Sequence, residues 1–415
     1  MGLPEPRRIH GPFQGDGAIR TISWSADSGR IAYLIDDEID EVFNLVVALP
    51  DGGARRRVNT LLVAGQTVLA YAWSPNGRRI AYISDEETPG VFELFTVEGE
   101  SAPTKVSPLR VTNGRVFSFR WSPDGTRLAY LADQEVDGRL ELYVVNASGG
   151  GEIKLSGTPL VDDVETDYAW APDSSRIAYR ADETAAGVEE LYTVRSDGQG
   201  RFQVNAPLAA GQQVADFAWS PSSDRLAYRS DDETATVFDL YTVAPDGTSR
   251  GRVSGPLAAG GDVFANYRWS PDGTRIAFRA DDRVDLDVEA FSVAADGTSL
   301  VRLNQELVSQ GDVFSFRRSP DGSRIAYLAD AEVDNELELY TIRPDGTERA
   351  RVNGDLVDGG TVGSFYVWSP DSARLAFGAE QVEAGQKEVY TAGTDGSGIV
   401  QLSGSGEFTG PIEWR

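Results

Sequence analysis

Alternating apolar and polar residues recur along the whole chain with a repeat length of roughly fifty residues. Each repeat divides into four short stretches, which residues 263–268, 127–130, 140–145 and 351–353 illustrate in different copies. The second stretch, R-L-A-Y at 127–130, alternates apolar and small side chains and is typical of a buried strand. In the third stretch Glu141 alternates with apolar residues, so we expect its side chain to face solvent. Because no stretch shows a helical period, the pattern predicts four antiparallel strands per repeat.

A turn sequence follows the first strand of every repeat, in the form W-S-P-D-G or a looser variant. Residues 121–125 and 269–273 carry the full form, in which proline presets φ and Asp-Gly completes a tight reversal. A second turn, P-D-G at residues 344–346, precedes the fourth strand. We expect each tryptophan to pack with its indole N–H hydrogen-bonded within its own repeat. The repeats begin near Trp24, Trp73, Trp121, Trp170, Trp219, Trp269, Arg318 and Trp368.

Two positions of the repeat, the aromatic residue of the second strand and the tryptophan that ends the first strand, lead to different expectations. An aromatic residue follows the alanine of the second strand in every copy, as at Tyr130 and Tyr327, and we expect this position to form the core between repeats. Arg318 stands where the other seven repeats have tryptophan. It is interpreted either as drift that the fold tolerates or as the mark of a locally polar cleft.

Eight tandem copies without a linker predict an all-β fold, an eight-bladed β-propeller of four-stranded antiparallel blades, in a single domain over residues 1–415. A closed ring is favoured because closure removes exposed sheet edges. Residues 7–23 and 408–414 both have the pattern of strands from incomplete repeats, and we expect the termini to take part in closing the ring. Either the N-terminal strand completes the last blade or the C-terminal segment docks elsewhere. A third interpretation is that this sequence is part of a longer array of repeats.

The repeat motif carries a family resemblance over nearly the whole chain. W-S-P-D-G-T-R-L-A-Y at residues 121–130, with a following strand that in its full form reads L-Y-x-V-x-x-D-G, as at residues 191–198 and 240–247, resembles the WD40-like repeat of TolB-type propellers. It is also similar to the propellers of prolyl oligopeptidases, although no hydrolase domain accompanies it. The resemblance implies a propeller that supplies protein-protein interaction surfaces. The chain has more repeats than TolB and lacks its separate N-terminal domain, so TolB's own partners are not carried over.

Composition and charge narrow the classes of partner. The 415 residues are 40% hydrophobic and 25% charged, which suits a folded globular protein with a substantial core. The formal net charge of −27 repels phosphate backbones and anionic lipid, so we expect no nucleic acid partner and no membrane insertion. Cations and basic protein surfaces are favoured instead. The N-terminus has no apolar signal segment, so we expect a cytoplasmic protein, or a periplasmic or extracellular one if Met1 is not the natural first residue.

The sequence does not contain the residues that several kinds of catalysis require. The chain has no cysteine, which excludes disulfides, thiolate metal sites and cysteine nucleophiles. Its single histidine, His10, lies in the expected N-terminal strand and is interpreted as an edge-strand residue. Neither G-x-S-x-G nor a G-x-G-x-x-G between a strand and a helix is present, so no serine hydrolase or dinucleotide site is expected.

The hairpin between the second and third strands carries the pattern D-x-E-x-D-G-x-x-E, most completely at residues 133–141. Oxygen ligands at positions 1, 3, 5 and 9, with a glycine for a sharp turn, are what Ca²⁺ needs to be wrapped by a short loop. The predicted metal ligands are Asp133, Glu135, Asp137 and Glu141, with Asp36, Glu38, Asp40 and Asn44 in the first repeat and Asp330, Glu332, Asp334 and Glu338 in the seventh.

Three interpretations of these acidic hairpins stay open: solvated loops that keep a sheet edge from aggregating, calcium sites, or a contact for a basic protein partner. The hairpins and the connectors between repeats should emerge at one face, opposite the P-D-G turns. We therefore predict a monomeric, non-enzymatic scaffold that binds a protein or peptide through an acidic loop face. The alternatives are a calcium-binding propeller in a cell-surface or secreted setting, and a metal-assisted hydrolase or lyase.

Overall fold

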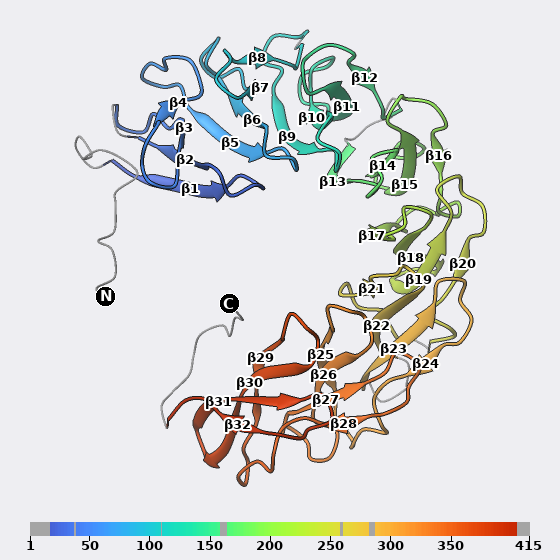
Figure 1. Cartoon of the computed structure of the whole chain (residues 1–415). Helices are drawn as coiled ribbons and strands as arrows, with labels where there is room; N and C mark the ends of the chain where they lie inside the picture. Colours follow the sequence, from blue (N-terminus) through green and yellow to red (C-terminus); the bar gives the residue numbers. More distant parts are fainter. Residues whose placement is uncertain are drawn as a thin grey trace, which may run out of the picture. The chain divides into compact units, whose positions relative to one another are not determined.

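The protein is built entirely from β-strands in the part that the structure, a computed structural model, describes: residues 17–36, 39–108, 110–157, 164–257, 260–281 and 287–404. These residues form eight four-stranded antiparallel sheets, and none of them lies in a helix (Figure 1). The predicted all-β, eight-bladed propeller class is confirmed. The described residues accordingly contain no helix that could span a lipid bilayer.

The chain divides into two compact units, Met1–Gln203 and Val204–Arg415, and each contains four of the sheets, called blades here. Blade one consists of β1 (Ile19–Trp24), β2 (Ile31–Ile35), β3 (Asn44–Ala48) and β4 (Arg56–Arg57). Blade two consists of β5 (Val68–Trp73), β6 (Arg79–Ser84), β7 (Glu93–Glu98) and β8 (Thr104–Lys105). Blade three consists of β9 (Val116–Trp121), β10 (Arg127–Ala132), β11 (Glu141–Asn146) and β12 (Ile153–Lys154). Blade four consists of β13 (Val164–Trp170), β14 (Arg176–Ala181), β15 (Glu190–Arg195) and β16 (Phe202–Gln203).

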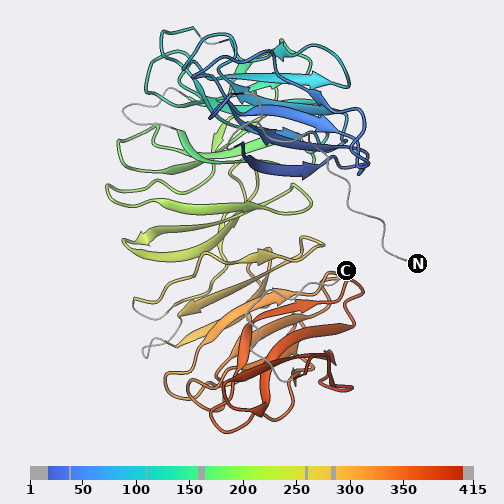
Figure 2. The same cartoon turned by 90° about the vertical axis from the view of Figure 1, so that its left-hand side faces the viewer.

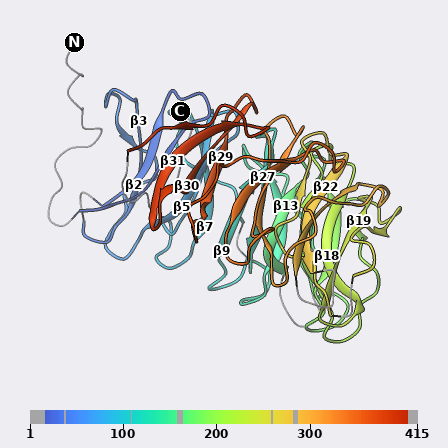
Figure 3. The same cartoon turned by 90° about the horizontal axis from the view of Figure 1, so that it is seen from below.

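The second unit repeats this order with longer hairpins in blades five and eight. Blade five consists of β17 (Val214–Trp219), β18 (Leu226–Thr234), β19 (Val237–Val243) and β20 (Gly251–Arg252). Blade six consists of β21 (Arg268–Trp269), β22 (Arg275–Asp281), β23 (Val288–Ala294) and β24 (Val301–Arg302). The strand expected over residues 263–268 was therefore wrong for most of its length, because a turn at 265–266 interrupts it and Val263 forms only an isolated bridge to Ala280. Blade seven consists of β25 (Val313–Arg318), β26 (Ile325–Ala329), β27 (Glu338–Ile342) and β28 (Ala350–Arg351). Blade eight consists of β29 (Val362–Trp368), β30 (Arg374–Glu383), β31 (Gln386–Gly393) and β32 (Val400–Gln401). The long β18–β19 hairpin is labelled in Figure 3.

The core of each unit lies between consecutive sheets, which stack face to face (Figure 2). The middle strands are covered on both faces, so all five residues Leu128–Ala132 of β10 are buried. Leu131 of blade three and Tyr168 of blade four belong to one buried cluster. Tyr130 and Tyr327 are fully buried, and this confirms the predicted aromatic core position. Tyr130 stacks on Tyr143 of the next strand with ring centroids 5.4 Å apart.

Four tryptophans connect neighbouring blades, namely Trp121, Trp170, Trp269 and Trp368, and for these the prediction of a hydrogen bond within the same blade was wrong. The indole N–H of Trp121 donates to the carbonyl of Ala72 in blade two, at 3.1 Å. Trp368 in the same way donates to the carbonyl of Arg317 in blade seven, at 3.1 Å. The side chains of a strand point out of the plane of its sheet, so the indole extends towards the neighbouring sheet and its nitrogen reaches the first strand of the preceding blade.

The first described strand, β1, completes blade one, but the segments expected to close the ring are not fully described. Residues 1–16, which include His10, and residues 405–415, which include the expected strand at 408–414, lie outside the described residues. The roles predicted for the termini and the single-domain organisation therefore stay predictions.

Candidate functional site

The acidic hairpins and the connectors lie at one end of each blade, as expected, because the first aspartate of the hairpin bonds to both segments. In blade three the Oδ1 atom of Asp133 accepts the N–H of Arg115 in the connector at 2.6 Å, and Oδ2 accepts the N–H of Gly138 at 3.0 Å. Asp330 of blade seven makes the equivalent bonds to the N–H groups of Asp312, at 2.5 Å, and Asn335, at 3.0 Å. Both aspartates are buried, and their oxygens fix the shape of the loops.

Blade one repeats part of this arrangement. Asp36 is buried and accepts the N–H of Ala18, and Asn44 accepts a hydrogen bond from the side chain of Asn59 at 3.0 Å. Asp40 is exposed at the tip of the hairpin. Glu38, the predicted ligand at the third position of the pattern, lies outside the described residues.

The carboxylate at the ninth position of the pattern is buried and paired with a cation of the fourth strand. Glu141 is fully buried, so the expectation that it faces solvent was wrong, and it forms an ion pair with Lys154. Glu338 in the same way pairs with Arg351 at 2.7 Å. Tyr143 donates its hydroxyl to Glu141 at 2.6 Å, and burial together with that carboxylate raises the pKa of Tyr143 above its ordinary range. The sequence signal for these pairs is a basic residue thirteen positions after the acid.

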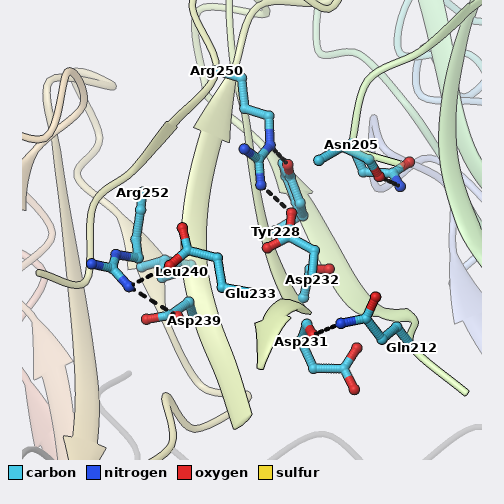
Figure 4. Close-up of polar contacts among 12 residues, drawn as sticks. Asn205, Gln212, Tyr228, Asp231, Asp232, Glu233, Asp239, Leu240, Arg250 and Arg252 are labelled. Atoms are coloured by element: carbon cyan, nitrogen blue, oxygen red, sulfur yellow. Dashed lines mark hydrogen bonds and ion pairs between the residues drawn. The ribbon is translucent and has the colours of Figure 1, made fainter. Parts of the chain in front are cut away.

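Figure 4 shows how far this internal pairing goes in blade five. Arg252 contacts Glu233 at 2.8 Å and Asp239 at 3.5 Å, while Arg250 pairs with Asp232 and donates to the hydroxyl of Tyr228 at 2.7 Å. Burial raises the pKa of Asp239, against the opposing effects of Ser254 and Arg252. Much of the acidity that the sequence places at the hairpins is therefore neutralised by the blade itself.

The third and fifth positions of the pattern lie at the exposed tips. Glu135 of blade three is partly neutralised by Lys154, at 3.1 Å, and by Arg110, at 3.8 Å. Asp137 and Asp334 are exposed. Within the described ranges, no three acidic or histidine side chains gather in a way that could hold a metal ion. Calcium binding at the predicted ligands stays a prediction.

In blade seven the hairpin and the connector line a cavity of about 200 Å³, and two of its four carboxylates form no ion pair with the described residues. Arg351 is the only cation of the lining, and it is engaged by Glu338 and by Asp355, each at 2.7 Å. Glu332 and Glu336 also line the cavity and form no ion pair with any described residue. The apolar part of the lining is Val333, whose surface is 50% exposed, and Leu356. This site can accept a cation carried on an apolar stem.

Comparison with known proteins agrees with this architecture. A family model described as the TolB beta propeller domain matches residues 21–246, more than half of the chain. The chain belongs to the TolB β-propeller family. This match confirms the resemblance drawn from the repeat motif. No curated protein matches this TolB-type chain.

Solved structures similar to this TolB-type propeller share its fold at low sequence identity. Dipeptidyl peptidase 4 of Porphyromonas gingivalis matches with a TM-score of 0.54 and 14% identity, over 95% of this chain and 60% of the peptidase chain. A eukaryotic initiation factor matches with a TM-score of 0.52 and 13% identity, over 94% of this chain and 90% of that one. The chain thus spans 60% of the length of that peptidase, and at these identities the likeness concerns the fold alone.

Proposed function

We propose that this TolB-type propeller is a non-enzymatic scaffold that binds a basic segment of a protein or peptide at the hairpin end of its blades. The cavity of blade seven is the anchor point, and it supplies the single observation that carries the proposal. Its lining holds four carboxylates, Glu332, Glu336, Glu338 and Asp355, against one arginine, Arg351. A family whose members act through protein contacts supports the same class of function.

The chemistry of the cavity selects the ligand. Two carboxylates that no cation of the described chain neutralises attract a lysine or arginine side chain, and the overall charge of −27 steers cationic segments towards the protein. Val333 and Leu356 offer apolar surface to the methylene stem of such a side chain. The ligand is therefore a segment in which basic and apolar residues alternate.

Blade three provides the contrast within the same chain. Its hairpin has the matching tip, with Val136 44% exposed, but Lys154 and Arg110 contact Glu135 there. The proposal therefore assigns the binding to blade seven and not to every copy of the acidic pattern.

A peptide titration tests this assignment. The fluorescently labelled probe is acetyl-Lys-Leu-Lys-Leu-Lys-amide, with the glutamate version of the same peptide as a negative probe, and binding to the full chain is followed by anisotropy. Replacing both Glu332→Gln and Glu336→Gln should weaken binding about tenfold, or ~1.4 kcal/mol. The matched control removes two charges from blade three, Glu135→Gln with Asp137→Asn, and should leave the affinity unchanged. Equal losses in the two double variants would show general charge attraction and contradict a site in blade seven.

Calcium binding is the second candidate for this hairpin, and it rests on the sequence pattern, because the described carboxylates are not gathered around one point. Glu332, Asp334 and Glu336 form no ion pair with the described residues, and they would have to move together to bind the ion. A cation that binds only the folded state must raise the unfolding temperature. Melts in CaCl₂ should then lie several degrees above melts in EDTA or MgCl₂, and Glu332→Gln should abolish the difference. Superimposable melts would remove this candidate.

A further inference from the structure

The break in the tryptophan rule coincides with a cavity in the second unit. Arg318 ends β25 of blade seven, at the end of the blade that carries the S-P-D-G turn and not the acidic hairpin. Between β21 of blade six and β25 lies a cavity of about 520 Å³. Its lining includes Arg268, Trp269, Phe316, Arg317 and Arg318.

The cavity has a simple structural cause. At the same position Trp269 reaches from blade six to the carbonyl of Ala218 in blade five, at 3.2 Å, and Trp368 reaches from blade eight to Arg317. The corresponding acceptor for blade seven is the carbonyl of Arg268, but Arg318 forms no hydrogen bond to it. Without the indole, the space between blades six and seven stays open.

The guanidinium of Arg318 is the unusual group in this cavity. Its three nitrogens are buried and make no hydrogen bond to any residue that the structure describes. Burial, with help from Arg275 and against Asp272, lowers the pKa of Arg318 to about 10, so the group still carries its charge at neutral pH. A buried charge without a hydrogen-bonding partner is strongly unfavourable, and an anion that reached it would relieve that cost.

The neighbouring charges favour an anion as well. Arg268 and Arg317 are exposed at the mouth of the cavity, and Arg275 lies close enough to influence Arg318. The nearest acid, Asp272, already accepts hydrogen bonds from Ser270 at 2.5 Å and from the N–H of Thr274 at 3.0 Å. In a chain of net charge −27, this is a locally cationic, partly aromatic cavity.

We propose that this cavity is a binding site for an organic carboxylate, whose carboxylate pairs with the Arg318 guanidinium while its apolar body lies against Trp269 and Phe316. The planar guanidinium matches a carboxylate through two parallel N–H···O bonds. The volume falls in the range of small-molecule sites, and the aromatic lining suits a flat apolar group. Because Arg318 has no hydrogen bonds to lose, its side chain can rotate to meet the ligand. The site is independent of the acidic hairpin in blade seven.

Calorimetric titration of the full chain tests the proposal with benzoate as the probe, benzamide as its neutral isostere and inorganic phosphate as a small anion. Benzoate should bind at least tenfold more tightly than benzamide. Arg318→Trp, which restores the residue of the other seven repeats, should reduce benzoate affinity at least tenfold, and Arg318→Lys should reduce it less. Arg343→Gln removes a positive charge from an exposed turn of the same unit and should change nothing.

The possible results separate clearly. Equal binding of benzoate and benzamide, or unchanged affinity in Arg318→Trp, would overturn the proposal. Binding of phosphate without benzoate would make the cavity an inorganic anion site and also overturn it. If no probe binds and Arg318→Trp only raises the unfolding temperature, the cavity is a packing defect and the proposal is wrong. If benzoate binds, the tripeptide Gly-Gly-Phe and its C-terminal amide distinguish the source of the carboxylate. Binding of the free acid that is tighter than that of benzoate and is lost in the amide indicates a peptide terminus.

Discussion

The junction between blades seven and eight and the junction between blades six and seven differ at the tryptophan position of the repeat, which is Trp368 in blade eight and Arg318 in blade seven. The backbone pairing at this position is the same in both blades. Trp368 pairs with Leu375 in its sheet, and Arg318 pairs with Ile325 in the same register. Trp368 is 6% exposed and joins a buried cluster with Tyr366, whereas Arg318 leaves a cavity of about 520 Å³. Strands and turns thus form the same scaffold at both junctions, while the residue at the tryptophan position decides whether the space between the blades is filled or left as a cavity.

Opening the closed junction should have the largest effect. Trp368→Arg removes a buried indole and its hydrogen bond to Arg317 and places a charge in an apolar cluster. We expect a loss of about 3–5 kcal/mol in the free energy of unfolding, measured by urea denaturation. Phe365→Ala in the same strand removes a half-exposed ring and is the control, with an expected loss of less than ~1 kcal/mol. Comparable losses in the two variants would show that the indole does not hold this junction.

Closing the open junction should have the opposite sign. Arg318→Trp removes a buried guanidinium without hydrogen bonds and fills the space with an indole that can donate to the carbonyl of Arg268. The free energy of unfolding should rise by about 2 kcal/mol, measured by the same denaturation. A drop in stability would mean that the arginine supports the fold and that the comparison of the two junctions is wrong.

Acid should weaken the turns at both junctions alike. Hydrogen bonds, first from Ser319 to Asp321 and from Ser369 to Asp371, lower the pKa of each carboxyl below its ordinary value of 3.8. The folded pKa is the lower one, so the stability from these bonds is present above pH 3.8 and is lost as the pH falls through the folded pKa. The urea midpoint should decrease between pH 5 and pH 2, and less so in Asp321→Asn with Asp371→Asn. An equal decrease in that double variant would assign the acid sensitivity to other carboxylates.

The smallest effect should distinguish one turn from the next. The pKa of Asp272 is lowered chiefly by the Ser270 hydroxyl and the Thr274 N–H, with a further contribution from the Arg318 charge. In Arg318→Trp that last contribution disappears, so the pKa of Asp272 should rise slightly while that of Asp321 stays the same. Carbon-13 NMR titration of the aspartate carboxyls measures both. A shift at Asp321 without one at Asp272 would contradict the charge contact between Arg318 and Asp272.

Part of the candidate site could be predicted from the sequence, because a repeated pattern marks it. The acidic hairpins were located correctly, and Asp133 and Glu141 are both central to the loop structure. Their partners could not be predicted from the hairpin alone, since Lys154 meets Glu141 only through the pairing of β11 with β12. The unpaired carboxylates of blade seven have the same origin, because Arg351 already pairs with Glu338 and Asp355 and forms no ion pair with Glu332.

Short-range periodicity was enough to predict the class of fold, most of the strands and turns, and the aromatic core, because it reports which side chains are buried and where the backbone must reverse. It failed at residues 263–268, where only Arg268 belongs to a strand, and at Glu141, which is buried. Tyr130 and the turn at residues 121–125 needed nothing further. The ion pairs that neutralise the hairpin carboxylates could be recognised only in the folded structure. The same holds for the contact of the Trp121 indole with the preceding blade and for the cavity beside Arg318. The physical reason is that pairing and cavity formation depend on residues far apart in the chain, whose distances are set by sheet register and by the stacking of one blade on the next.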